Sequence, residues 1–356
     1  MIDLEKLSVR PDATLHSAMD HVNQSGRGIV LLLDHRGRFL ATVTDGDIRR
    51  AILAGAGVDS PVTNALSNSD GTLRHSVTAH ATATRAEQLA IMKEAEIRHL
   101  PLLDDDRQVV ALSLSDELVK SPPLPVQAVI MAGGFGTRLR PLTDDTPKPM
   151  LQIAGRPLLE RTIEGLQQAG VHRINVTTHY MPEKITRHFG SGSEFGVELN
   201  YISEDEPLGT AGALSLLGEI DEPLLVINGD ILTNADFGSL VRFHQERKVM
   251  LTVGVRHYDL KVPYGVVESE NGCVIGLREK PSYAFFVNAG VYLLDPSVRQ
   301  YIPRGRRYDM TDLIELLLKI GKPVASYPIL EYWIDIGQHD DFDRAQREVG
   351  QLRKSA

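Results

Sequence analysis

The chain has 356 residues, enough for two domains, and 42% of them are hydrophobic, as in ordinary globular proteins. A formal net charge of −9 argues against a surface for nucleic acid or an anionic membrane. A single cysteine excludes an intrachain disulfide and is typical of a reducing compartment. The chain start lacks the pattern of a signal peptide, and no apolar run reaches membrane-spanning length. We therefore expect a cytoplasmic protein with no nucleic-acid and no membrane partner.

Residues 1–120 contain an internal repeat with a period of about seventy residues. Each unit has the pattern of a helix, two strands and the start of a second helix. The first helices of the two units are expected to begin near Thr14 and at Thr84. The expected strands are 28–33 and 39–43 in the first unit and 99–103 and 109–112 in the second.

Each unit ends in the motif [ST]xxD, which is Thr44 with Asp47 in the first and Ser113 with Asp116 in the second. Tandem units of this kind resemble a CBS-domain pair, in which the hydroxyl and the carboxylate of the motif often hold the ribose of a nucleotide. The resemblance implies a nucleotide effector, allosteric regulation and a homodimer or larger homo-oligomer. Alternatively, the motifs are helix N-caps, for which Ser, Thr and Asp are favoured, and the module only dimerises.

Three prolines within residues 121–125 predict a short, semi-rigid linker to a second domain at 126–356. Apolar strands alternate there with amphipathic helices, such as one expected at 156–169. This alternation predicts an α/β, Rossmann-like, doubly wound sheet with ligands at the carboxyl ends of its strands. A more β-rich region follows, with strands expected at 250–255, 265–268, 274–278 and 286–294.

An apolar strand expected at 128–131 leads into a glycine-rich loop at 133–138. Glycine allows backbone angles closed to other residues and close approach of a ligand. Backbone N–H groups in such a loop can form an anion-binding nest, to which Arg138 adds a positive fork. Lys148, between two prolines, adds a second cation. The stretch therefore predicts a polyphosphate cradle.

Two common phosphate motifs do not fit this loop. A Walker P-loop requires GxxxxGK[ST], which the sequence lacks, and a Rossmann fingerprint requires a glycine where this chain has Leu139. The glycines alone are also compatible with a plain turn between a strand and a helix. The whole string AGGFGTRLRPLT, followed by PKPM, resembles the signature of the sugar-1-phosphate nucleotidylyltransferases, and later motifs of that family follow in order to about residue 340.

The resemblance implies a reaction in which a nucleoside triphosphate and a sugar 1-phosphate give an NDP-sugar and pyrophosphate. It assigns Arg138 to the leaving pyrophosphate, Lys148 to the α-phosphate region and Lys280 to the sugar phosphate. The nucleotide-binding residues that it implies are Ala132, Gly133, Gly134, Gly136, Thr137, Arg138, Glu204, Gly209 and Thr210. It assigns sugar contacts to Gly265, Glu279, Lys280 and Asn288. For Glu279 and Lys280, a solvated surface pair is the alternative.

Two aspartates beside glycines, Asp230 and Asp335, resemble the metal ligands of the family. Asp230 follows a buried strand at 224–227, and Asp335 lies between apolar residues in YWIDIG. Two carboxylates together with substrate phosphates suit Mg²⁺, which prefers hard oxygen ligands. Taken alone, Asp230 has the alternative role of a helix cap.

Glu204 lies just before LGTA, where members of the family read the edge of the base. An ionised carboxylate accepts two hydrogen bonds, which matches the neighbouring N1–H and N2 amino donors of guanine. We therefore expect GTP, and the chain resembles the glucosamine-1-phosphate and mannose-1-phosphate guanylyltransferases. Alternatively, Glu204 caps the next turn or faces solvent, and the donor is UTP or dTTP. A non-catalytic nucleotide sensor is a further alternative, although the complete set of cations and carboxylates argues against it.

Overall fold

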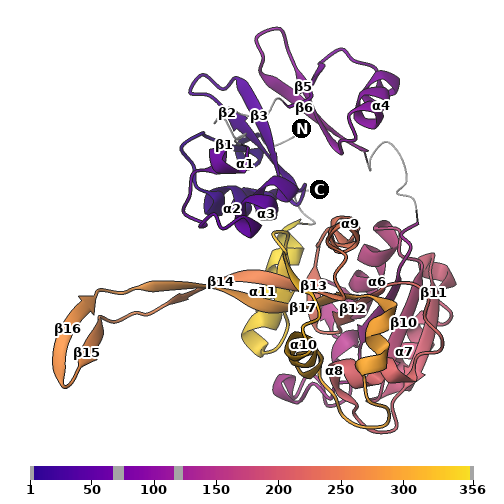
Figure 1. The fold of residues 1–356 in the computed structure, drawn as a ribbon. Helices are drawn as coiled ribbons and strands as arrows, with labels where there is room; N and C mark the ends of the chain where they lie inside the picture. Colours follow the sequence, from indigo (N-terminus) through magenta and orange to yellow (C-terminus); the bar gives the residue numbers. More distant parts are fainter. Residues whose placement is uncertain (1–3, 67–75, 116–122, 353–356) are drawn as a thin grey trace.

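The computed structural model describes residues 4–66, 76–115 and 123–352. It contains a small N-terminal module and a larger domain built on a seven-stranded sheet, from which a long β-ribbon projects (Figure 1). No helix in the described part of the chain is long and apolar enough to cross a bilayer. The predicted fold class, a doubly wound mixed α/β sheet with an α+β module at the N-terminus, is confirmed.

Two three-stranded sheets of the same topology form the N-terminal module. In each, a short first strand pairs parallel with the middle strand, and the third strand pairs antiparallel with it. The strands are β1 (Ser8–Val9), β2 (Ile29–Leu33) and β3 (Phe39–Thr44), then β4 (Ala79–His80), β5 (His99–Leu103) and β6 (Val109–Leu114). The helices are α1 (Leu4–Leu7), α2 (Leu15–Ser25), α3 (Asp45–Leu53) and α4 (Arg85–Glu94).

The two units repeat in detail. The middle strands β2 and β5 begin at Ile29 and His99, a spacing of seventy residues. The register of the hairpin shifts after Leu32 in the first unit and after Leu102 in the second. The repeat predicted from the sequence is therefore present in the backbone, including its irregularities.

The [ST]xxD motif of the first unit forms a helix cap. The Thr44 hydroxyl accepts a hydrogen bond from the Asp47 N–H at 3.1 Å, and Asp47 Oδ2 accepts from the Thr44 N–H at 2.9 Å. This reciprocal capping box satisfies backbone donors at the start of α3. Ser113 is buried at the end of β6, whereas Asp116 lies outside the described residues. The cap is confirmed for the first unit, and the nucleotide effector stays a prediction.

The sheet of the larger domain has the order β11-β10-β7-β12-β17-β14-β18. The first four strands are parallel, β17 is antiparallel to both of its neighbours, and β18 is parallel to β14. The strands are β7 (Gln127–Met131), β10 (Arg173–Thr178), β11 (Glu198–Ser203), β12 (Leu224–Asn228), β14 (Leu251–Lys261), β17 (Ser282–Leu294) and β18 (Val324–Pro328).

Helices cover both faces of this sheet, so its central strands are apolar on both sides. Helices α6, α7 and α9 pack on one face, whereas α10 and the segment around α8 pack on the other. The helices are α6 (Leu158–Gln168), α7 (Pro182–Phe189), α8 (Gly209–Gly212), α9 (Phe237–Arg247), α10 (Met310–Lys319) and α11 (His339–Leu352).

Two small sheets flank the main one. They pair β8 (Gln152–Ile153) with β9 (Arg156–Pro157), and β13 (Ile231–Thr233) with β19 (Trp333–Asp335). The predicted helix at 156–169 starts later than expected, at Leu158, because Arg156 pairs in β9 and Pro157 keeps an extended ψ of 143° at the N-cap.

A two-stranded ribbon, residues 256–287, leaves the larger domain, and we call it the arm (Figure 1). The outer parts of β14 and β17 pair antiparallel along it. Its tip is the hairpin of β15 (Val266–Glu270) and β16 (Cys273–Arg278). The predicted strands 250–255 and 286–294 were therefore too short, because their outer residues are mostly exposed and lack the alternation of a half-buried strand.

A buried ion-pair cluster joins the two parts of the chain. Arg49 of α3 donates to Asp45 Oδ2 at 2.8 Å, to Glu331 Oε1 at 2.6 Å and to the Pro328 carbonyl at 2.7 Å. One guanidinium thus faces two buried carboxylates and fully balances the charge of one. Burial raises the pKa of Asp45 to about 7, and the negative charge of Glu331 adds to this effect while Arg49 opposes it.

The raised pKa of Asp45 makes stability depend on pH. The folded value of about 7 lies above the ordinary 3.8, so this carboxyl contributes stability that is complete below the ordinary value and is lost as pH rises through the folded one. The melting temperature of the wild type should therefore fall between about pH 4 and about pH 7, and Asp45→Asn should flatten this dependence. The exposed control Asp59→Asn should keep the wild-type slope. An unchanged slope in Asp45→Asn would contradict the prediction.

Candidate active site

The glycine-rich loop connects β7 to a short 3-10 turn at Thr137–Leu139. Gly136 has a left-handed φ of 62°, and a Cβ there would lie 2.9 Å from Thr143 Cγ2 and 3.2 Å from Lys148 Cβ. Both the backbone conformation and the packing therefore require glycine at this position. At Gly134, by contrast, an added Cβ would meet no atom within 4 Å.

These two glycines form a matched pair for testing the loop. Gly136→Ala should destabilise the protein by about 1–2 kcal/mol for the left-handed backbone alone, with a further loss if Thr143 and Lys148 cannot move. Gly134→Ala should change the stability little, because nothing lies near the added methyl group. Thermal unfolding of both variants measures the difference. Equal shifts in melting temperature would contradict the loop geometry.

The loop forms one wall of a cavity of about 540 Å³ at the carboxyl ends of β7 and β12. This volume is within the range of small-molecule sites, roughly 300–1,000 Å³. The predicted residues that line it are Ala132, Gly133, Gly134, Gly136, Thr137, Arg138, Lys148, Glu204, Gly209, Thr210 and Asp230. The structure therefore brings together every residue predicted to bind the nucleotide.

Asp230 is held against the loop by its neighbour Gly229. The Gly229 N–H donates to the Met131 carbonyl at 2.9 Å, and a Cβ on Gly229 would lie 2.4 Å from that oxygen. Only glycine lets the two strand ends approach so closely. Lys148 Nζ donates to Asp230 Oδ2 at 2.6 Å. Asp230 leads into strand β13 and not into a helix, so its interpretation as a helix cap is wrong.

Asp335 reaches the same edge through the pairing of β13 with β19, which places it opposite Ile231. Burial and then the negative charge of Asp230 raise the pKa of Asp335, whereas Lys148 and Arg138 oppose that rise. Two carboxylates that repel each other beside the phosphate-binding loop predicted from the sequence form an oxygen donor set that fits Mg²⁺. Protons would compete with such an ion at the Asp335 carboxylate at low pH.

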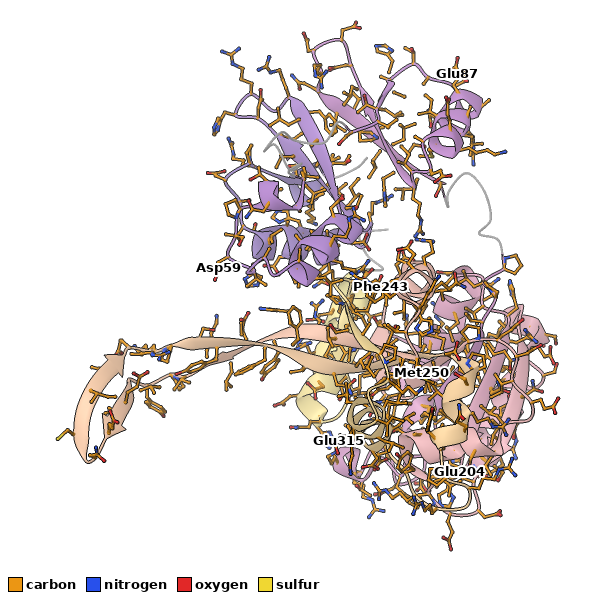
Figure 2. The ribbon with its side chains drawn as sticks, viewed as in Figure 1. Asp59, Glu87, Glu204, Phe243, Met250 and Glu315 are labelled. Carbon is orange, nitrogen blue, oxygen red and sulfur yellow. The ribbon has the colours of Figure 1, made fainter. Side chains whose placement is uncertain are left out.

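Glu204 lies just after β11 and is 7% exposed, on the side of the larger domain away from the N-terminal module (Figure 2). Its Oε2 accepts a hydrogen bond from the Leu208 N–H at 2.9 Å, so the turn-capping alternative is correct for this oxygen. Its Oε1 faces the loop, where a Cβ on Gly133 would lie 2.8 Å away. One carboxylate oxygen thus holds the turn, and the other packs against the cradle.

Thr210 has hydrogen-bond partners that the sequence did not reveal. The Thr210 N–H donates to Asp309 Oδ1 at 3.1 Å, and the Thr210 hydroxyl accepts from the Met310 N–H at 2.8 Å. Asp309 and Arg307 also line the cavity, and neither was predicted. An aspartate ahead of the amphipathic run 310–319 is a helix-start signal that would have located this segment.

The predicted sugar-binding residues are divided between two places. Asn288 lies on β17 where the arm leaves the domain, and its Oδ1 accepts from the Gly290 N–H at 3.0 Å. Gly265, Glu279 and Lys280 lie on the arm at the base of its tip hairpin, directly before β15 and directly after β16. None of these three described residues lines the cavity. The cavity of one chain therefore contains the nucleotide part of the predicted site without the sugar part.

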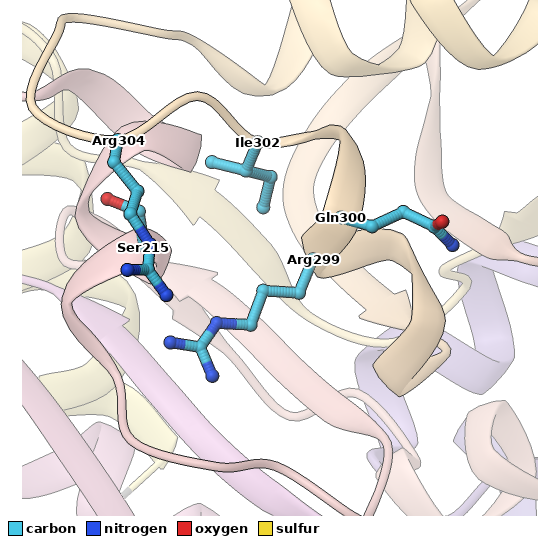
Figure 3. A pocket seen from close by; sticks show the side chains of 5 residues that line it. All are labelled: Ser215, Arg299, Gln300, Ile302 and Arg304. Carbon is cyan, nitrogen blue, oxygen red and sulfur yellow. The ribbon is translucent and has the colours of Figure 1, made fainter.

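A smaller hollow of about 330 Å³ lies elsewhere in the domain (Figure 3). The residues that line it are Ser215, Arg299, Gln300, Ile302 and Arg304. The Arg299 guanidinium donates to the carbonyls of Leu217 and Gly218, so this cation already holds a loop. None of the described residues lining this hollow belongs to the predicted site, and we place the candidate site in the larger cavity.

Residues 127–351 match the model of the family described as Nucleotidyl transferase, which covers more than half of the chain. The chain belongs to the nucleotidyl transferase family. Residues 3–54 match the CBS domain. The family resemblance predicted from the cradle and the first unit of the repeat is confirmed.

Individual relatives differ in the nucleotide that they use. The chain is 34% identical over 245 residues to a UTP–glucose-1-phosphate uridylyltransferase from Synechocystis, with 63% of each chain covered. It is 33% identical over 231 residues to a mannose-1-phosphate guanylyltransferase from Mycobacterium tuberculosis, covering 63% of this chain and 64% of the relative. These matches span less than two thirds of either relative. HddC from Yersinia pseudotuberculosis, solved in complex with GMP-PN, superposes with a TM-score of 0.50 at 26% identity, covering 63% of this chain and 99% of HddC.

Proposed function

We propose that the protein is a sugar-1-phosphate nucleotidylyltransferase of the cytoplasm. The observation that carries this proposal is the edge of the sheet where the cradle with Arg138 and Lys148 meets the carboxylates Asp230 and Asp335. In the reaction, a phosphate oxygen of the sugar 1-phosphate bonds to the α-phosphorus of the nucleoside triphosphate. The bond from that phosphorus to the bridging oxygen of the β-phosphate breaks, and pyrophosphate leaves with the electron pair.

The attacking phosphate is already an anion at neutral pH, so the reaction requires no general base. The difficulty is the repulsion between two polyanions, which positioning and charge neutralisation overcome. In the proposed arrangement Arg138 binds the departing pyrophosphate and Lys148 the α-phosphate. Asp230 and Asp335 would hold Mg²⁺, which neutralises phosphate charge when bound.

We propose GTP as the preferred donor because of Glu204. Its Oε1 lies beside the cradle, and each carboxylate oxygen has two lone pairs, so Oε2 can accept from the base as well as from Leu208. The two neighbouring donors of guanine match this pair of acceptors better than the single N3–H of uracil. The Mycobacterium tuberculosis guanylyltransferase and the GMP-PN complex of HddC support GTP, whereas the Synechocystis relative supports UTP as the alternative.

The metal site is tested by neutralising each aspartate separately. Asp230→Asn or Asp335→Asn should lower turnover by at least ~10²-fold, as expected for the loss of one charge contact in the transition state. Pyrophosphate release from each nucleoside triphosphate with a panel of sugar 1-phosphates, in the presence of Mg²⁺, measures the activity. Asp221→Asn, an exposed aspartate ahead of β12, serves as the control and should keep the wild-type rate. Near-normal turnover of both site variants at saturating Mg²⁺ would exclude the two-aspartate site.

The base preference is tested at Glu204. Glu204→Gln should reduce the preference for GTP over UTP by roughly 30- to 150-fold, equivalent to about 2–3 kcal/mol for a charge-assisted contact. The measurement is kcat/KM for GTP, UTP, dTTP and ATP. Glu206→Gln, an exposed neighbour, should leave the preference unchanged. A wild-type preference for UTP or dTTP, or an unchanged ratio in Glu204→Gln, would refute the assignment.

A further inference from the structure

The arm has no partner in its own chain to stabilise its tip. The hairpin β15–β16 is a separate two-stranded sheet, and no described strand pairs with either of its outer edges. An isolated two-stranded hairpin is marginally stable in water. Figure 1 shows the ribbon extending away from both parts of the molecule. Its tip therefore requires a surface to pack against.

The arm also exposes apolar side chains on both of its strands and at its tip. Tyr264 is 75% exposed and Leu277 is 68% exposed. Cross-strand neighbours are apolar together, since Tyr258 lies opposite Phe285 on the ribbon and Val267 lies opposite Leu277 on the hairpin. The exposed set is Tyr258, Leu260, Tyr264, Val267, Val274, Ile275, Leu277, Phe285 and Phe286. Contiguous exposure of this kind marks an interaction surface.

The stem of the arm is a continuous ladder where it leaves the domain. The pairs from Val255 with Asn288 out to Lys261 with Ser282 continue without a shift of register. The one irregularity in the pairing of β14 with β17 lies between Val253 and Val255, inside the domain. There a Cβ on Gly254 would lie 2.9 Å from both the Val291 carbonyl and Ile329 Cδ1, so the backbone at this point is tightly packed.

The cavity lacks a cation for the second substrate, and the arm carries one. Among the described residues that line it, the cations are Arg138, Lys148 and Arg307. Lys148 is paired with Asp230, and Arg307 is paired with Asp309 at 3.3 Å. Two phosphate-bearing substrates must bind there if the proposed function holds. Lys280, at the base of the tip hairpin, is the additional cation assigned to the second substrate.

We infer that the arm of one copy of this chain completes the active site of a second copy. This inference rests on the proposed function for the role of Lys280. The cavity that needs the tip belongs to the same kind of chain, so the partner is a second identical copy. A reciprocal exchange about a twofold axis closes the assembly as a dimer and buries the apolar residues of both arms.

The first experiment measures assembly and does not depend on activity. Sedimentation of the full chain should show a dimer, and Leu260→Ser combined with Phe285→Ser should dissociate it. Leu318→Ser, which changes an exposed leucine on α10 to the same residue, should leave the dimer intact. A monomeric wild type, or a dimer that survives the double substitution, would overturn the inference.

The second experiment asks which chain provides Lys280. Lys280→Ala and Asp230→Asn chains, each inactive alone, are co-expressed with different affinity tags, and mixed dimers are isolated through both tags. With arms exchanged, one of the two sites receives an intact arm and has an intact cavity, so activity should recover to about half of the wild-type value. With arms acting on their own chain, both sites carry a lesion, and a mixed dimer without activity overturns the inference.

Failure of the proposed function gives a different result from failure of this inference. If the wild type releases no pyrophosphate with any substrate pair, the proposed function fails, and the sedimentation result alone decides whether the arms join two copies. If the wild type is active and mixed dimers remain inactive, the function holds and the exchange of arms is wrong.

Discussion

The candidate site depends on how closely two central strands approach at their carboxyl ends. The strands β7 and β12 are parallel neighbours, and the hydrogen bond from the Gly229 N–H to the Met131 carbonyl joins the residue after β12 to the last residue of β7. A side chain at position 229 would separate Asp230 from the cradle and from Lys148. The same displacement would disturb β13, which pairs with the strand that carries Asp335. One backbone contact therefore holds the phosphate-binding loop and both carboxylates to a single edge of the sheet.

The sequence predicts those parts of this edge whose structure depends on neighbouring residues in the chain. The string from Ala132 to Arg138 encodes its own turn, because Gly136 must adopt a left-handed backbone. The strand before Asp230 is apolar on both faces and is recognisable without any partner. The meeting of Asp230 with Asp335 has no local signature, since β13 and β19 are three residues each and distant in sequence. Before the structure was known, only the family resemblance predicted that these two residues lie close together.

The outer parts of β14 and β17 and the segment around Asp309 were missed for two different reasons. Asp309 begins a regular amphipathic helix, and its helix-start signal was present but not used. The outer parts of β14 and β17 leave no such signal, because outward of Val255 their apolar residues, such as Leu260 and Phe285, are exposed. Hydrophobic alternation reports burial within one chain, so a strand whose apolar residues have no partner in that chain does not follow the pattern. Only the structure shows the full length of β14 and β17.

The N-terminal module contacts both segments that lead to the proposed substrate and metal residues. The ring of His16 on α2 lies 5.5 Å from that of His257, where β14 enters the arm. Leu330 packs into the core of the first unit, and the adjacent Glu331 accepts a hydrogen bond from Arg49 of that unit. The segment that carries Leu330 and Glu331 continues to Asp335. These contacts tie the position of the module to two different parts of the candidate site.

The Thr44–Asp47 cap stands at the start of the helix that carries Arg49. A nucleotide bound by the Thr44 hydroxyl and the Asp47 carboxylate would compete with the hydrogen bonds of that cap. A regulatory ligand there would need no contact with the cavity, since a change in α3 is already a change in the partner of Glu331. Coupling between two sites requires an element with two arrangements that both sites bias. The cap at the start of α3 is the contact that such a ligand would change first, and Arg49 on the same helix would carry that change to Glu331.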